Sequence, residues 1–175
     1  MDSSKVTQVP IPWICKFEGC NCNRSGSSKY CYEHKVIARR KFQEMVSQQN
    51  EERTERYAEF ETIWSDAWAN AMRAGDEAKP LPMVVCDPSV GREYHVPDGP
   101  CGFAWVIVKP GNSSFAHWLK KKGHARRDSY YGGVTIWIDA FNQSHERKST
   151  AAHVLAKELG AAFPKLRIYS MSRLD

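Results

Sequence analysis

The chain has 175 residues, of which 42% are hydrophobic and 26% are charged, a balance typical of globular proteins and unlike that of disordered ones. Its longest apolar runs, such as 103–108, are too short to span a bilayer, so we expect no membrane protein. The net charge of +5 comes from the C-terminal half, because residues 80–175 hold 13 lysines and arginines against 8 aspartates and glutamates. This excess favours an anionic partner for that half.

The N-terminal residues 1–12 are polar, contain two prolines and predict a loose arm. They lack the basic-then-apolar layout of a secretion signal, so we expect a cytoplasmic protein. In a reducing cytosol, the six cysteines of the chain are better explained by metal binding than by disulfides.

A cysteine-rich segment precedes the first predicted helix. Cys15, Cys20, Cys31 and His34 have the spacing C-x4-C-x10-C-x2-H, and four such ligands close a tetrahedral Zn²⁺ shell. Either Cys20 or Cys22 supplies the second ligand, and we favour Cys20. The alternative is a set of buried free thiols beside an unrelated histidine. Since four protein ligands leave no open position for water, we expect a structural zinc rather than a catalytic one.

This spacing, followed by Arg39, Arg40 and Lys41, resembles the short zinc motifs of phage and mobile-element proteins, in which the histidine begins a basic helix. The additional cysteine at position 22 departs from that motif. The C-terminal half, with GFAWV, GGVTIW and a terminal SRLD, is similar to small uncharacterised proteins of tailed phages. The resemblance implies a phage-encoded chain in the host cytoplasm and no particular activity.

Residues 35–74 contain neither proline nor glycine and predict a helical arm that ends at Gly75. The segment Gln48–Arg56 is almost entirely polar, so either one long helix or a hairpin of two helices broken near Gln49–Asn50 fits. A strong apolar stripe at helical spacing follows, and its aromatic members are Tyr57, Phe60, Trp64 and Trp68. We expect this stripe to bind a protein partner or a second copy, or to be buried on the chain's own C-terminal domain.

The remaining residues alternate between short strands and helices. The sequence predicts strands at Met83–Cys86, Arg92–Val96, Phe103–Val108, Gly133–Asp139 and Leu166–Met171, and helices from Asn112 or Ser113 to Lys122 and from Ser144 to Leu159. We therefore predict an α+β protein with three parts: a zinc knuckle with its arm (1–34), a long helix or helical hairpin (35–75) and a basic α/β domain (76–175). The domain should hold a three- to five-stranded mixed sheet and two helices.

The densest positive run lies around the predicted loop Gly123–Gly132, where cations alternate with aromatic side chains. Such a mixture suits phosphate backbones and stacked bases, so nucleic acid is a possible partner. The residues concerned are Lys120, Lys121, Lys122, Arg126, Arg127, Tyr130 and Tyr131. Two alternatives are an acidic protein partner and simple solubility, because lysines are favoured at a helix C-terminus in any case.

No catalytic motif is evident, and we do not expect an enzyme. Asp139, His145 and Lys148 could form a catalytic cluster, and Asn142-Gln143-Ser144 is either a ligand site or a helix cap. A second metal site is conceivable from three further residues, which are Cys86, His95 and Cys101. Buried or strand-end thiols explain the two cysteines better.

The leading functional hypothesis is a non-enzymatic zinc-binding adaptor that binds nucleic acid, a protein partner or both. One alternative is a virion or assembly subunit with no role in nucleic-acid binding. The other is a small metal-dependent nuclease.

Overall fold

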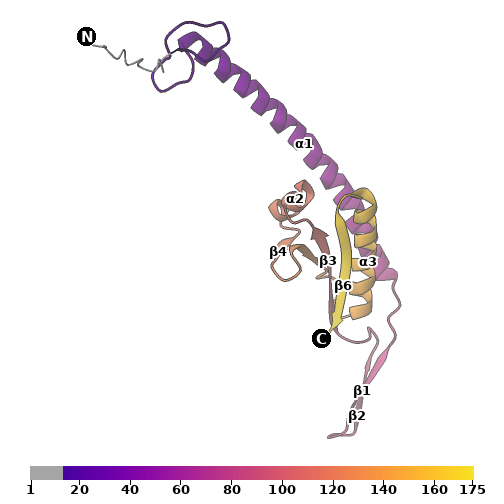
Figure 1. Cartoon of the computed structure of the whole chain (residues 1–175). Helices are drawn as coiled ribbons and strands as arrows, with labels where there is room; N and C mark the ends of the chain where they lie inside the picture. The colour runs from indigo at the N-terminus through magenta and orange to yellow at the C-terminus, as the bar shows by residue number, and fades with distance from the viewer. Residues whose placement is uncertain (1–13) are drawn as a thin grey trace, which may run out of the picture. The chain divides into compact units, whose positions relative to one another are not determined.

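The structure, a computed structural model, describes residues 14–175, so the predicted N-terminal arm lies outside the described residues. The chain divides into two compact units, Met1–Glu55 and Arg56–Asp175. The long helix α1 (Tyr32–Glu77) contributes to both, and the strands and remaining helices all belong to the second unit (Figure 1).

Helix α1 is a single helix of 46 residues, so the helical-hairpin alternative is wrong. The polar stretch between its two apolar parts consists mainly of Gln, Glu and Arg, which are good helix formers. Local side-chain pairs add support, since Ser47 donates to Glu51 and Arg53 donates to Asn50. The low hydrophobicity of this polar stretch therefore reflects an exposed helix surface and does not mark the end of a helix.

The C-terminal half of α1 packs on the second unit. Phe60, Trp64, Ala67 and Ala71 are buried in the core of that unit, and Tyr57 and Trp68 pack against it. The aromatic stripe was predicted either to bind a partner or to be buried on the chain's own C-terminal domain. The structure shows the second of these arrangements. Because burying large aromatic side chains is strongly favourable, the stripe has little surface left for docking.

Two short strands, β1 (Met83–Asp87) and β2 (Arg92–Val96), form a separate antiparallel hairpin. The turn between them is stabilised by Asp87, whose carboxylate accepts hydrogen bonds from the backbone and the hydroxyl of Ser89. Gly91 closes the turn with a φ of +63°, a conformation that favours glycine. Both strands agree with the sequence-based prediction to within one residue.

A four-stranded sheet with two helices forms the body of the second unit. Its elements in chain order are β3 (Gly102–Lys109), α2 (Ser114–Lys122), β4 (Arg126–Asp128), β5 (Gly133–Trp137), α3 (His145–Ala162) and β6 (Arg167–Leu174). This confirms the predicted α+β class, with a Cys/His cluster near the N-terminus, a long helix and a small sheet domain. Strand β4 is an addition, because it lies inside the segment predicted to be a basic loop.

The sheet order is β4-β5-β3-β6, and every neighbouring pair is antiparallel, so the prediction of a mixed sheet is wrong in this respect. The helix α3 carries the chain from β5 across β3 to β6. As a result, β5 and β6 are parallel to each other without being neighbours. This is the β-α-β-β-α-β arrangement of ferredoxin-like domains.

Helices α2 and α3 differ in how their ends are capped. At α2, the hydroxyl of Ser113 accepts the backbone N–H of Ala116, and Gly123 ends the helix in the left-handed region. At α3, Ser144 occupies the N-cap position, but its buried hydroxyl donates to the carbonyl of Asp98 at 2.8 Å. Ser144 is therefore the N-cap residue by position, in agreement with the helix-cap alternative, but its side chain holds the preceding loop and does not bond to the first turn of α3.

The two faces of the sheet differ. On one face, alternate residues of the central strands are buried beneath the helices and form the core, namely Ala104, Val106, Val108, Val134, Ile136 and Ile138. The opposite face carries Phe103, Trp105 and Lys109 of β3 and their partners on β5 and β6, and we call it the open face. The core joins this first face to residues of the three helices, such as Trp64 of α1, Trp118 of α2 and Leu155 of α3.

Candidate functional site

The cysteine-rich segment folds as a short loop held by backbone hydrogen bonds. Cys15 donates to the carbonyl of Cys22 at 2.9 Å, and Cys20 donates to that of Phe17 at 3.0 Å. Gly19 turns the chain between them with a φ of +76°. A further bond, from the backbone N–H of Lys16 to the carbonyl of Lys29 at 3.0 Å, joins this segment to the chain just before Cys31. The loop is thus ordered without a hydrophobic core, which a segment of this size cannot build.

Helix α1 supplies the other half of the cluster. Cys31 directly precedes the helix and accepts the backbone N–H of Lys35, and His34 lies in the first helical turn. Residues three apart on a helix point to the same side, so Cys31 and His34 face the loop together. The ring of Phe17 stacks on the imidazole of His34 with 3.9 Å between centroids and covers one side of it.

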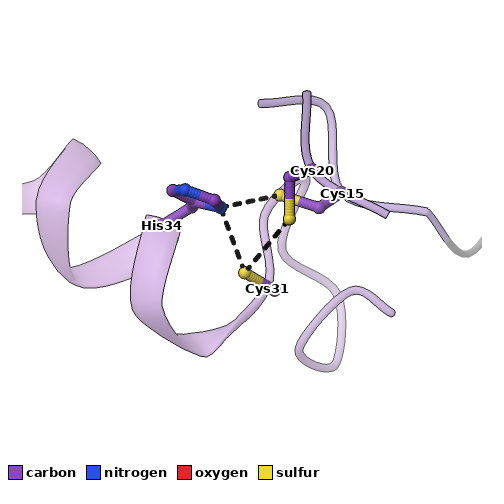
Figure 2. Close-up of side chains that lie close together, drawn as sticks. All are labelled: Cys15, Cys20, Cys31 and His34. Carbon is purple, nitrogen blue, oxygen red and sulfur yellow. Dashed lines mark hydrogen bonds between the residues drawn. The ribbon is translucent and has the colours of Figure 1, made fainter. Parts of the chain in front are cut away.

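Figure 2 shows the four side chains pointing toward one another. The Nδ1 atom of His34 lies 3.2 Å from the sulfur of Cys31 and 3.6 Å from that of Cys15, and the sulfurs of Cys20 and Cys31 are 3.9 Å apart. All four ligand atoms lie within 4.8 Å of one another, an arrangement that could hold a metal ion. No disulfide joins them, because a bonded sulfur pair would be about 2 Å apart.

The thiols of the cluster differ in acidity. Burial of Cys15 raises its pKa, but hydrogen bonds from the backbone of Cys31 and Phe17 and from His34 outweigh this effect and lower the pKa to about 6. The pKa values of Cys20 and Cys31 are raised above the usual value for a thiol. Backbone hydrogen bonds, from Cys22 to Cys20 and from His34 to Cys31, lower these two pKa values, but burial and hydrogen bonds with the thiol of Cys15 raise them by more. One thiolate is therefore favoured before the others lose their protons.

Comparisons with protein-family models, with curated proteins and with solved structures find no match to this chain. The site is therefore judged on its geometry. Among residues 14–175, Cys15, Cys20, Cys31 and His34 form the one group of this kind able to hold a metal ion. None of the helices in the same range is both long and apolar enough to cross a membrane.

The other cysteines lie outside this group. Cys22 is exposed, so Cys20 is the member of the C-N-C pair that joins the cluster. Cys86 and Cys101 are exposed as well, and they form no metal-binding group with His95 within the described part of the chain. Of the two alternatives, buried thiols or strand-end residues, the structure supports the second, because Cys86 lies next to the end of β1 and Cys101 directly precedes β3.

The predicted nucleic-acid-binding residues do not form one continuous surface. Lys122 pairs with Glu61 at 2.5 Å, and the ammonium of Lys121 lies over the ring of Tyr57. Arg126 and Arg127 are neighbours on β4, and successive strand residues point to opposite faces of the sheet. The basic residues that are consecutive in the sequence therefore have different neighbours in the structure.

One part of the basic segment does converge on a cleft. Lys120 and Arg127 line a cavity of about 540 Å³ together with His117, which the sequence analysis missed. His117 and Lys120 are three residues apart on α2, and this spacing was the available signal. Gly111, Gly132 and Gly133 also line it, and the ammonium of Lys120 donates to the carbonyl of Gly111 at 3.2 Å. Asp128 also lines the cavity.

Asp128 organises the turn that carries Tyr130 and Tyr131. Its Oδ1 atom accepts the backbone N–H groups of both tyrosines at 2.9 Å, and its Oδ2 accepts the hydroxyl of Thr135 at 3.0 Å. The backbone N–H of Tyr131 is the main cause of a lowered pKa at Asp128, with further contributions from Thr135 and Tyr130. The carboxylate is thus engaged as a structural acceptor.

We expect Asp128→Ala to lower the free energy of unfolding by about 1 kcal/mol, because three hydrogen bonds to a half-exposed carboxylate are lost. Since the folded pKa of Asp128 is lowered, its contribution is present above the unfolded value of about 3.8 and is lost as the pH falls through the folded value. Urea unfolding of both proteins at neutral pH and in acid measures this. Equal stabilities at neutral pH would contradict it.

The residues of the polar corner after β5 have separate interactions. Lys148 is buried and donates to the carbonyl of Gly102 at 3.4 Å. No side-chain hydrogen bond or ion pair links it to Asp139 or His145 within the described residues. The neighbouring Phe141 and Asn142 both adopt positive φ angles, of 67° and 51°, so the chain makes a tight turn here.

Proposed function

We propose that this protein is a non-enzymatic, zinc-binding adaptor whose second unit binds nucleic acid. The observation that carries the zinc assignment is the spacing of the four ligand atoms. In a tetrahedral shell with Zn–S and Zn–N distances of about 2.3 and 2.0 Å, two sulfurs would be about 3.8 Å apart and a sulfur and nitrogen about 3.5 Å. The separations of 3.9, 3.6 and 3.2 Å fit these values.

The ligand chemistry favours zinc over other metals. Three thiolates and one imidazole in a tetrahedral arrangement are typical of structural zinc sites, whereas magnesium and calcium prefer oxygen ligands. Cys15 and Cys31 are buried, and four protein ligands complete the shell. We infer a structural metal that fixes the loop of residues 14–31 against the start of α1, with no role in activating water.

The nucleic-acid part of the proposal is supported by the cleft that His117, Lys120 and Arg127 line. Two long cations and an imidazole around one cavity are suited to a phosphate group, and most contacts in nucleic-acid complexes are made to phosphates. Residues 80–175, which contain this cleft, hold 13 lysines and arginines against 8 aspartates and glutamates, and this excess would attract a polyanion over a longer range.

We expect the double substitution Lys120→Ala with Arg127→Ala to weaken binding of labelled DNA and to lower the slope of log K against log salt by about 2, because two phosphate contacts are lost. Fluorescence anisotropy at several salt concentrations measures both quantities on the zinc-loaded chain.

Lys122→Ala is the matched control for this test. Its ammonium is already paired with Glu61, so its removal should change the slope little. Equal effects of the control and the double variant would indicate non-specific charge attraction. No DNA or RNA binding by the parent protein at low salt would overturn the nucleic-acid part of the proposal.

A further inference from the structure

We propose that the open face of the sheet binds single-stranded nucleic acid, with bases stacked on its aromatic side chains. The inference rests on the proposed nucleic-acid function and specifies which form of nucleic acid is bound and where. Most of the residues on which it depends lie outside the basic segment, on strands that are distant in sequence.

Strand register places the aromatic residues of this face side by side. Trp105 of β3 lies opposite Trp137 of β5, and the centroids of their rings are 5.1 Å apart. Phe103 packs edge-on against Trp137 at 6.3 Å, and Tyr131 lies 6.1 Å from Trp105. Four aromatic rings therefore form a continuous cluster, three of them on the two central strands and Tyr131 in the turn before β5.

Part of this cluster is open to solvent. Trp105 and Ile107 are buried and form its floor, whereas Trp137 remains 43% exposed and Met171 on β6 remains 36% exposed. Phe103 and Tyr169 are half-buried. Exposed large apolar groups of this kind are costly on a monomer surface, and a contiguous patch of them indicates a binding site.

The charges around the aromatic cluster select the occupant. Register places Arg173 opposite Phe103 and Arg167 opposite Lys109, and Arg126 opposite Thr135 on the other edge of the sheet. The guanidinium of Arg173 lies 5.3 Å from the ring centre of Phe103. Cations on both sides of an aromatic surface match a chain that alternates phosphates with flat bases.

Two carboxylates also lie on this side, and neither changes the balance. Asp128 is engaged by the backbone of Tyr130 and Tyr131 and by Thr135. Asp139 lines a cavity of about 300 Å³ beside Trp137, together with Arg126 and Thr135. The cations of the face therefore outnumber its carboxylates. This excess of positive charge favours a polyanion over an apolar partner.

Base stacking on Trp137 requires unpaired bases, because the faces of bases within a duplex are already stacked on each other. The open face should therefore bind single strands in preference to duplexes. The cleft of Lys120 and Arg127, by contrast, contacts phosphates, which both forms offer. This difference allows the two proposals to be tested separately.

The test compares Trp137→Ala with the parent protein, both zinc-loaded and full length, using labelled oligothymidylate, oligouridylate and a blunt DNA duplex of equal length. We expect Trp137→Ala to weaken single-strand binding about tenfold and to leave both the salt slope and duplex binding unchanged. Tyr94→Ala is the control, since Tyr94 is an exposed aromatic residue on the separate hairpin. It should leave single-strand binding unaltered.

Arg173→Gln provides a second variant whose side chain is exposed, in case Trp137→Ala is not folded by circular dichroism. It should weaken single-strand binding and lower the salt slope by about 1. Unchanged single-strand affinity in a folded Trp137→Ala or in Arg173→Gln would overturn the inference, as would equal affinity of the parent for duplex. In those cases an effect of Lys120→Ala with Arg127→Ala would still support the proposed function. Absence of all binding would overturn both.

Discussion

Purified without chelator, the chain should contain about one zinc ion per molecule, and Cys31→Ser should lose it. Cys31 is buried, lies 3.2 Å from the His34 nitrogen and is 3.9 Å from the sulfur of Cys20, so its thiolate would be central to the shell. A hydroxyl is a poor zinc ligand, and three remaining ligands would leave the ion exposed to water. Metal analysis by mass spectrometry after gel filtration measures the ratio.

Cys22→Ser is the matched control for this prediction. Cys22 is exposed and lies outside the cluster, although it is only two residues from Cys20. This variant should keep its zinc. Loss of zinc from Cys22→Ser with retention in Cys20→Ser would show that the other cysteine of the pair is the ligand. Absence of metal from the parent protein would contradict the proposed zinc site as a whole.

Metal removal should also affect the two units differently. The loop of residues 14–31 is held by a few backbone bonds and the Cys/His group, so chelation should unfold it together with the start of α1. The second unit has its own core, which contains Trp64 and Trp118. Near-ultraviolet circular dichroism of these tryptophans should therefore persist after chelation.

The sequence was most informative where the determining interactions are local. The ligand spacing from Cys15 to His34 predicted a cluster because turns and one helical turn are enough to bring those residues together. Strand β2 was predicted with its observed ends, Arg92 and Val96, because turn residues flank a short alternating segment. The apolar periodicity of α1 likewise identified the residues that the core buries.

Long-range register was the information that the sequence could not supply. Arg126 and Arg127 appear as one basic pair, but β4 is a strand of only three residues, too short for a periodic signal. Which side each arginine faces is decided by pairing with β5. The alignment of Trp105 with Trp137 depends in the same way on two strands that are separated in the chain by helix α2 and strand β4. Periodicity alone also could not tell whether the stripe of α1 is covered by its own domain or by another chain.

Trp64→Asp should unfold the second unit. Trp64 is 7% exposed and packs on three aromatic rings, those of Trp68, Trp118 and His124, at centroid distances of 5.2, 6.4 and 4.6 Å. Removing a large buried aromatic side chain costs about 3–5 kcal/mol, and burying a carboxylate without a partner adds to this cost. Since small domains are stable by only about 5–15 kcal/mol, we expect loss of the cooperative thermal transition.

Val36→Asp tests whether this effect comes from burial on the domain or from helix α1 itself. Val36 lies on the same helix but is 55% exposed, so an aspartate there should change the free energy of unfolding by less than about 1 kcal/mol. Trp64→Asp alone should abolish the transition followed by circular dichroism. A folded, monomeric Trp64→Asp protein would mean that the aromatic stripe is not held by its own domain. In that case, the stripe would again be the first candidate for a partner-binding surface.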